Sequence, residues 1–139
     1  MKKKISVLLM VLVMVLSATV TSYAAVGDEV MPRATASTIF TINRISGTTA
    51  NAVVTTDFSG IANEYSVVLY LQKLTNGSWI NDSTNPDYAL FNNGINKATV
   101  VVSNTYDSLQ YGATYRLMVV SRDIINGVEY RTTTYSNSF

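Results

Sequence analysis

Apolar and polar residues alternate along most of the chain beyond residue 37, and this period of two is typical of β-strands with one buried face. The pattern is strongest in residues 64–74, where Tyr65, Val67, Leu69 and Leu71 are predicted to share one face. The segments predicted as strands are residues 38–45, 48–58 and 64–74, a short return strand that begins near residue 79, and residues 97–103, 114–123 and 128–139.

Turn residues separate these segments. Asn76-Gly77 and Asn126-Gly127 predict tight hairpin turns, because both residue types readily adopt positive φ angles. Ser59-Gly60 is expected to end the second strand. Residues 81–96 are predicted to form a long connection with a short edge strand near residues 88–91. No helical period of useful length occurs, so the sequence predicts an all-β fold, an antiparallel Greek-key β-sandwich of about seven strands.

The first 24 residues resemble a targeting segment. Lysines at positions 2–4 precede an apolar run over residues 5–16, and small residues flank Tyr23. This is the layout of a secretory signal peptide, and the apolar run is shorter than the ~20 residues that a membrane-spanning helix needs. Residues 25–37 are then a flexible leader and residues 38–139 a single domain. We therefore expect a protein secreted by a Gram-positive bacterium, extracellular or loosely associated with the cell wall.

Composition excludes several kinds of chemistry. The chain has neither histidine nor cysteine, which excludes Ser-His-Asp and Cys-His catalysis, the usual zinc sites, disulfides and a thioether lipid anchor. Signal cleavage removes three lysines and lowers the formal charge from +1 to −2. The remaining cations are scattered, so nucleic acid is not an expected partner. We expect no enzyme activity, cofactor or metal. Less favoured alternatives are paired carboxylates acting on a glycoside and calcium bound by residues 81–87.

One motif stands out at the start of the strand predicted over residues 114–123. The stretch LQYGATYRLMV contains Leu109, Gly112 and Tyr115. In a Greek-key sandwich, a tyrosine at this place packs its ring in the core and joins its hydroxyl to a backbone group a few residues upstream, which is the tyrosine corner. We expect Tyr115 to play this part, with Leu109 closing the base of the core and Gly112 making the bend. These three residues are predicted to be structural.

The stretch SLQYGATYRLMVVSRDIINGVEY resembles the crossover and following hairpin of fibronectin type III domains, whose usual pattern is Leu-x-Pro-Gly-Thr-x-Tyr. Leu109, Gly112 and Tyr115 match that pattern by type and spacing, whereas Tyr111 and Ala113 depart from it. The early tryptophan that is usual in these domains is also missing. The resemblance implies an immunoglobulin-like sandwich. The whole chain also resembles short single-domain proteins that Firmicutes secrete, and that resemblance implies no activity.

Aromatic residues are the candidate ligand-binding groups. Trp79, Tyr88 and Phe91 are close in the sequence, and exposed rings of this kind bind sugars or anchor protein partners; the competing interpretation is that they cover the core. Candidate binding loops are residues 57–63 and 123–128. The favoured function is a non-catalytic extracellular binding module for an unknown protein or glycan. The alternatives are a small carbohydrate-binding protein for cell-wall or host glycans and a structural subunit that self-associates through its last strand.

Overall fold

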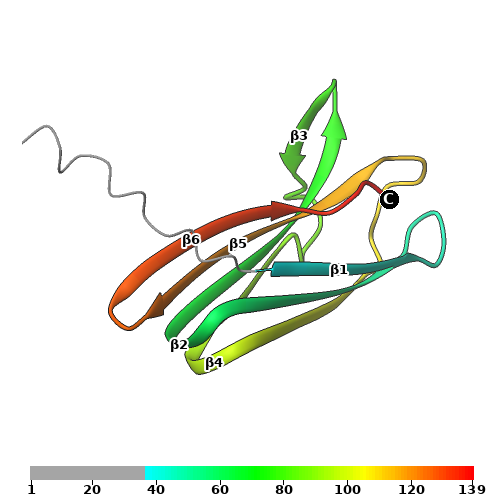
Figure 1. Cartoon of the computed structure of the whole chain (residues 1–139). Helices are drawn as coiled ribbons and strands as arrows, with labels where there is room; N and C mark the ends of the chain where they lie inside the picture. Colours follow the sequence, from blue (N-terminus) through cyan, green and yellow to red (C-terminus); the bar gives the residue numbers. More distant parts are fainter. Residues whose placement is uncertain (1–36) are drawn as a thin grey trace, which may run out of the picture. The chain divides into compact units, whose positions relative to one another are not determined.

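The computed structural model describes residues 37–139, and this part of the chain is one antiparallel β-sheet without helices (Figure 1). The predicted all-β class is therefore confirmed. The predicted signal peptide and residues 25–36 of the leader lie outside the described residues. Among residues 37–139 there is also no helix of a length and hydropathy suited to crossing a membrane. The strands are β1 (Ser37–Arg44), β2 (Ala50–Thr75), β3 (Ser78–Asn81), β4 (Ala89–Tyr106), β5 (Tyr115–Ile125) and β6 (Val128–Tyr135).

Strand β2 has different neighbours along its two halves. Along one edge of β2, β4 pairs with residues 50–70 and β3 with residues 72–75. Along the other edge, β1 pairs with residues 50–57 and β5 with residues 64–73. The β1 half of the sheet consists of β1, residues 50–57 of β2 and residues 99–106 of β4. The β5 half consists of β3, β5, β6, residues 64–75 of β2 and residues 89–95 of β4. The sheet curls where β2 and β4 pass from one half to the other (Figure 1).

The predicted break at Ser59-Gly60 does not occur. The segments predicted as separate strands over residues 48–58 and 64–74 are one strand, β2, and residues 88–91 and 97–103 are likewise joined within β4. The register between β2 and β4 shifts between Asp57 and Ala62, which marks a β-bulge, and bulges bend strands without ending them. Ser59 and Gly60 therefore lie in a strand that bends together with its partner, and β2 turns back at this point without ending (Figure 1).

The hydrophobic core lies on the inner face of the curled sheet. In β2 the buried apolar positions are even-numbered up to Ala62 and odd-numbered from Val67 to Leu71, because the bulge shifts the alternation by one residue. The buried face predicted for residues 64–74 is confirmed at Val67, Leu69 and Leu71, whereas Tyr65 is half-buried. The buried apolar side chains are Ala50, Ala52, Val54, Phe58, Ala62, Val67, Leu69, Leu71, Val100, Tyr106, Leu109, Tyr115, Leu117 and Val119.

Both predicted hairpin turns are confirmed. Asn76 and Gly77 join β2 to β3 with φ angles of 51° and 79°, and Asn126 and Gly127 join β5 to β6 with φ angles of 52° and 80°. Two successive positive φ values match the twist of the flanking strands, which fixes the strand register. The second turn therefore sets the register in which β6 pairs with β5.

Candidate functional site

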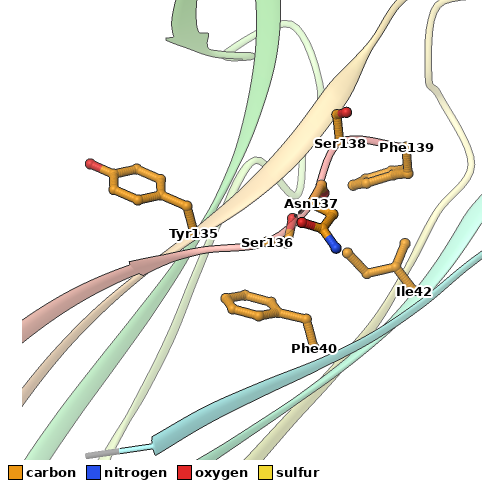
Figure 2. Close-up of a pocket in the computed structure, with 7 residues that line it drawn as sticks. All are labelled: Phe40, Ile42, Tyr135, Ser136, Asn137, Ser138 and Phe139. Atoms are coloured by element: carbon orange, nitrogen blue, oxygen red, sulfur yellow. Dashed lines mark hydrogen bonds between the residues drawn. The ribbon is translucent and has the colours of Figure 1, made fainter.

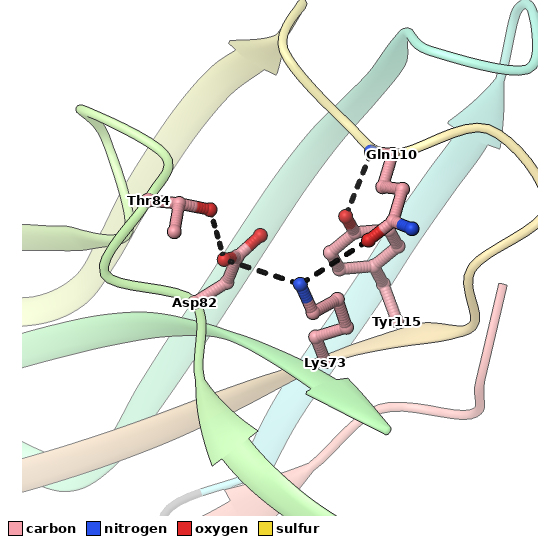
Figure 3. Close-up of polar contacts among 5 residues, drawn as sticks. All are labelled: Lys73, Asp82, Thr84, Gln110 and Tyr115. Carbon is pink, nitrogen blue, oxygen red and sulfur yellow. Dashed lines mark hydrogen bonds and ion pairs between the residues drawn. The ribbon is translucent and has the colours of Figure 1, made fainter. Parts of the chain in front are cut away.

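The tyrosine motif lies where the crossover from β4 enters β5. The Tyr115 hydroxyl accepts a hydrogen bond from the backbone N–H of Gln110 over 2.8 Å (Figure 3), and its ring is fully buried. Burial raises the pKa of Tyr115 above its ordinary value. Leu109 is buried below it, and Gly112 has a φ of 73°, a value that glycine adopts without strain. The side chains thus have the geometry of a tyrosine corner, and their part is structural.

The oxygen-rich loop after β3 also has a structural part. Asp82 is only 4% exposed and lies 3.8 Å from the Lys73 ammonium, and it accepts a hydrogen bond from the Thr84 hydroxyl (Figure 3). Asn85 is buried, and its side-chain oxygen accepts a hydrogen bond from the backbone N–H of Asp87 over 3.1 Å. These oxygens face protein donors. No group of three or more acidic side chains suited to a metal ion occurs in residues 37–139.

The three candidate aromatic residues do not come together. Tyr88 packs against the hydrophobic core. Trp79 is half-buried and Phe91 is 74% exposed, and both lie on the outer face of the β5 half. Trp79 pairs with Leu74 and Phe91 with Val68, so they are separated by about 20 Å along β2, at ~3.3 Å per residue. Their closeness in the sequence therefore does not create one aromatic cluster.

A cation lies between two aromatic rings on this outer face. The Arg116 guanidinium carbon lies 4.5 Å from the centre of the Trp79 ring and 4.1 Å from the centre of the Tyr135 ring, which are cation–π distances. Arg116 Nε donates a hydrogen bond to Gln72 Oε1 over 2.9 Å, and Gln72 Nε2 donates one to Asn81 Oδ1 over 3.0 Å. Within residues 37–139 Arg116 has no ion pair and its two terminal nitrogens have no acceptor. The Arg116 guanidinium is thus held by two aromatic rings and one hydrogen bond, and the N–H groups of its terminal nitrogens are free to donate to another molecule.

The pairing registers arrange this outer face in rows across the strands. Arg116 and Gln72 form the first row. The second contains Ala89, Tyr70, Met118 and Tyr135, the third Phe91, Val68, Val120 and Thr133, the fourth Asn93, Ser66, Arg122 and Arg131, and the fifth Ile95, Glu64, Ile124 and Glu129. Apolar side chains fill most of the second and third rows and half of the fifth. We call these five rows, together with Trp79 beside the first, the aromatic face.

Charged side chains occupy one end of the aromatic face. Glu129 forms ion pairs with Arg122 at 2.8 Å and with Arg131 at 2.6 Å. The hydrogen bond from Arg122, followed by that from Arg131, lowers the pKa of Glu129 below its ordinary value. Glu64 lies in the same row and has no ion pair within the described residues. This end carries a carboxylate without a cation, whereas Arg116 at the other end is a cation without a carboxylate.

The outer face of the β1 half has a different composition, and we call it the polar face. Its rows contain Ser37, Asp57 and Thr99, then Ile39, Thr55 and Val101, then Thr41, Val53 and Ser103, then Asn43, Asn51 and Thr105. No aromatic ring occurs in these rows, and the one charged side chain, Asp57, accepts hydrogen bonds from the hydroxyls of Ser37 and Thr99. Asn51 Oδ1 accepts a hydrogen bond from the Thr105 hydroxyl over 2.9 Å. The polar side chains of Asn51 and Thr105 on this face therefore hydrogen-bond to each other.

Asp123 lies at the end of the inner face, although the sequence predicts residues 123–128 as an exposed binding loop. It belongs to β5, pairs with Tyr65 and Tyr130, and is 1% exposed. Neither carboxylate oxygen has a hydrogen-bond partner, and burial raises the pKa of Asp123. Residues 57–63, the other predicted loop, belong to β2. Strand β2 thus continues through residues 57–63, where the sequence predicts a loop, and within residues 123–128 only Asn126 and Gly127 form a turn, between β5 and β6.

The last strand has an open edge, as the structural-subunit alternative requires. β6 pairs with β5 on one side, and no strand among residues 37–139 pairs with its other side. A pocket of about 340 Å³ lies between β1 and the end of β6 (Figure 2). Phe40 and Ile42 of β1 line it from one side and residues 135–139 from the other. Phe139 extends the pairing, because it exchanges two backbone hydrogen bonds with Tyr115.

Comparisons with known protein families and with curated proteins give no match. No model of a known protein family matches the chain, and no curated protein does. The site must therefore be interpreted from its own geometry.

Sequence reasoning missed Arg116 and Tyr135 as members of the site. These residues are far from Trp79 and from each other in the sequence, and only the pairing of β5 with β2 and β6 brings them beside Trp79. The signal in the sequence that could have found Arg116 is the alternation of inward and outward side chains along a strand. Arg116, Met118 and Val120 alternate with the buried residues of β5, so their outward direction could be predicted once the tyrosine corner had fixed the inner face.

Proposed function

We propose that the protein is a secreted, non-catalytic module that binds another macromolecule outside the cell through the aromatic face. The observation that carries this proposal is the Trp79–Arg116–Tyr135 stack beside two rows of apolar side chains. Trp, Tyr and Arg are the residues that most often dominate binding energy in protein interfaces, and Met and Phe are enriched there. Export rests on the signal-like segment at residues 1–24.

We further propose that the fold is a fibronectin type III-like Greek-key sandwich, with the β1 half and the β5 half as its two layers. The tyrosine corner at Tyr115 supports this proposal. It is also supported by the pairing of β1 with only the first part of β2 and of β5 with only the last part. If β2 and β4 are each counted as two strands at the bend, the strand count approaches the seven of that class. The layers then bury the inner face and leave the aromatic face outward.

The carbohydrate-binding alternative has less support. Stacking on a sugar needs an open aromatic ring, but Tyr88 packs on the core and Arg116 covers one side of Trp79. Phe91 is open, yet its neighbours Val68 and Val120 are apolar, and sugar sites need polar groups around the ring. Apolar neighbours favour a protein partner instead.

The proposal is tested by capture experiments with three immobilised forms of the protein, exposed to culture medium and to cell-wall fractions. Wild type is compared with Phe91→Ser on the aromatic face and with Val101→Ser on the polar face. Phe91 and Val101 are both exposed and both lie on β4, so the substitutions should have similar effects on stability. We expect Phe91→Ser to reduce retention of the bound macromolecule by at least about tenfold, the equivalent of ~1.4 kcal/mol. Equal retention by all three forms would falsify the assignment to this face.

A further inference from the structure

The aromatic face has two ends that complement each other. Val120 lies in its middle row, four positions from Arg116 and four from Ile124 along β5. Ile124 is flanked in its row by Glu64 on β2 and Glu129 on β5's other neighbour, β6. A copy of the face turned end over end about the Val120 row therefore places Arg116 opposite two carboxylates.

Shape supports the same pairing. A hollow of about 360 Å³ lies at the acidic end of the face, lined in part by Glu64, Ser66, Asn93, Ile95 and Arg122. At the opposite end the Trp79 ring stacks on Arg116. One end of the face thus presents a bulky aromatic–cation pair, and the other a hollow with an unpaired carboxylate.

We propose that the partner of the aromatic face is a second copy of this chain. This inference rests on the proposed function, since it names the macromolecule that the same face binds. The two copies pack outer face to outer face, related by a two-fold axis that runs across the strands at the row of Val68 and Val120. Such an interface is isologous, so each copy contributes the same patch. The Arg116 of each copy lies between Glu64 and Glu129 of the other.

The arrangement accounts for the remaining rows. Turning the face about the Val120 row sets the second row against the fourth, so Tyr135 of one copy faces Arg131 of the other, a cation–π pair. The third row faces itself, which buries Phe91, Val68 and Val120 against their own copies. Phe91, which is 74% exposed in the single chain, is then covered. The charged and apolar groups left open on one copy each gain a partner.

Cross-linking tests the axis directly, because the natural chain has no cysteine. Packed sheets lie ~10 Å apart, too far for a disulfide but within reach of a short bis-maleimide. Val120→Cys, on the axis, should give a covalent dimer at micromolar concentration. Thr55→Cys, on the polar face, is the matched control and should remain monomeric. Equal cross-linking of the two variants, or none of Val120→Cys, would overturn the arrangement.

Charge reversal tests the contact between the two ends. In sedimentation equilibrium we expect wild type to form dimers and both Arg116→Glu and Glu64→Arg to raise the dissociation constant at least tenfold. The double variant should recover part of the lost affinity, because the charge pair between positions 116 and 64 is re-formed with its signs reversed while Glu129 remains acidic. Asp107→Arg, which changes net charge as Glu64→Arg does but lies in the loop after β4, should have no effect. Circular dichroism checks that each variant is folded.

The outcomes separate the two proposals. Wild-type protein that stays monomeric at high concentration overturns the second-copy partner. If such a monomer still retains a macromolecule through Phe91 in the capture experiment, the binding function stands with another partner. If dimers form but no Arg116 or Glu64 variant affects them, the dimer uses another surface and the second-copy arrangement fails, whereas the capture experiment with Phe91→Ser still decides whether the aromatic face binds another macromolecule.

Discussion

The two halves of the sheet both have an apolar inner face, whereas their outer faces differ. Both halves bury Val and Tyr side chains on the inside, together with Ala in the β1 half and Leu in the β5 half. Outside, the β1 half carries Thr, Ser and Asn with single aliphatic residues between them, whereas the β5 half carries Trp79, Phe91, Tyr135 and the stacked Arg116. Folding makes the same demand on both outer faces, which is solubility. We therefore attribute the difference between them to the binding function that we propose for the aromatic face.

The largest expected effect concerns the interior that both halves share. Tyr115→Phe removes the acceptor of the Gln110 N–H and should lower the free energy of unfolding by about 1 to 3 kcal/mol. Urea unfolding measures it. Tyr111→Phe is the matched control, because Tyr111 is exposed, and it should be neutral. Below the unfolding transition, Tyr115→Phe should associate as wild type does, which separates stability from binding; equal stability of both variants would mean that the corner bond contributes nothing.

The second effect contrasts the outer faces by adding a charge to each. Phe91→Asp places a carboxylate in the middle row of the aromatic face and should weaken association at least about tenfold, or ~1.4 kcal/mol. Val101→Asp does the same on the polar face and should leave association unchanged. Sedimentation velocity over a concentration series measures both. A loss of association in the Val101 variant would erase the contrast between the faces.

The third effect concerns Asp123, the buried carboxyl on the inner face of the β5 half. Asp123→Asn keeps the shape and removes the charge, so it should raise the free energy of unfolding at neutral pH by about 1 kcal/mol. Because burial raises the pKa of Asp123 in the folded protein above the ordinary 3.8, the folded state binds this proton more tightly than the unfolded state. The contribution of Asp123 to stability is therefore greatest below that value and decreases as pH rises through the raised pKa.

The direction of this pH dependence is tested by measuring the free energy of unfolding of both proteins from neutral pH down to about pH 3.8. The difference between Asp123→Asn and wild type should be largest at neutral pH and should shrink as the pH falls toward 3.8. A difference that grows on acidification would contradict the burial of an unpartnered carboxyl at this position.

The smallest effect concerns how Arg116 is held. Gln72→Leu removes the acceptor of Arg116 Nε but leaves the two aromatic rings, so association should weaken by about threefold, less than for Arg116→Glu. Asn51→Leu breaks the comparable hydrogen bond to Thr105 on the polar face and should not affect association. If Gln72→Leu weakens association as much as Arg116→Glu, the rings do not hold the guanidinium in position.

Local signals predicted some parts of the molecule and not others. The hairpin turns follow from Asn-Gly dipeptides, and the inner face of β5 follows from the spacing of Leu109, Gly112 and Tyr115, since these depend on a few adjacent residues. The continuity of β2 could not be predicted, because a bulge at residues 57–62 exists only where β4 pairs alongside. The stack around Arg116 depends on three strand pairings at once, so residue spacing gave no sign of it.

The most direct test of the central claim uses the fluorescence of Trp79, which is the only tryptophan of the chain and lies on the aromatic face. Acrylamide quenching of its emission is measured from low to high protein concentration, with Phe91→Asp as the non-associating control. We predict that Trp79 becomes less accessible to quencher as dimers form and that Trp79 of the control stays accessible throughout. Dimers that leave Trp79 as accessible as in the monomer would contradict the assignment of the aromatic face as the binding surface.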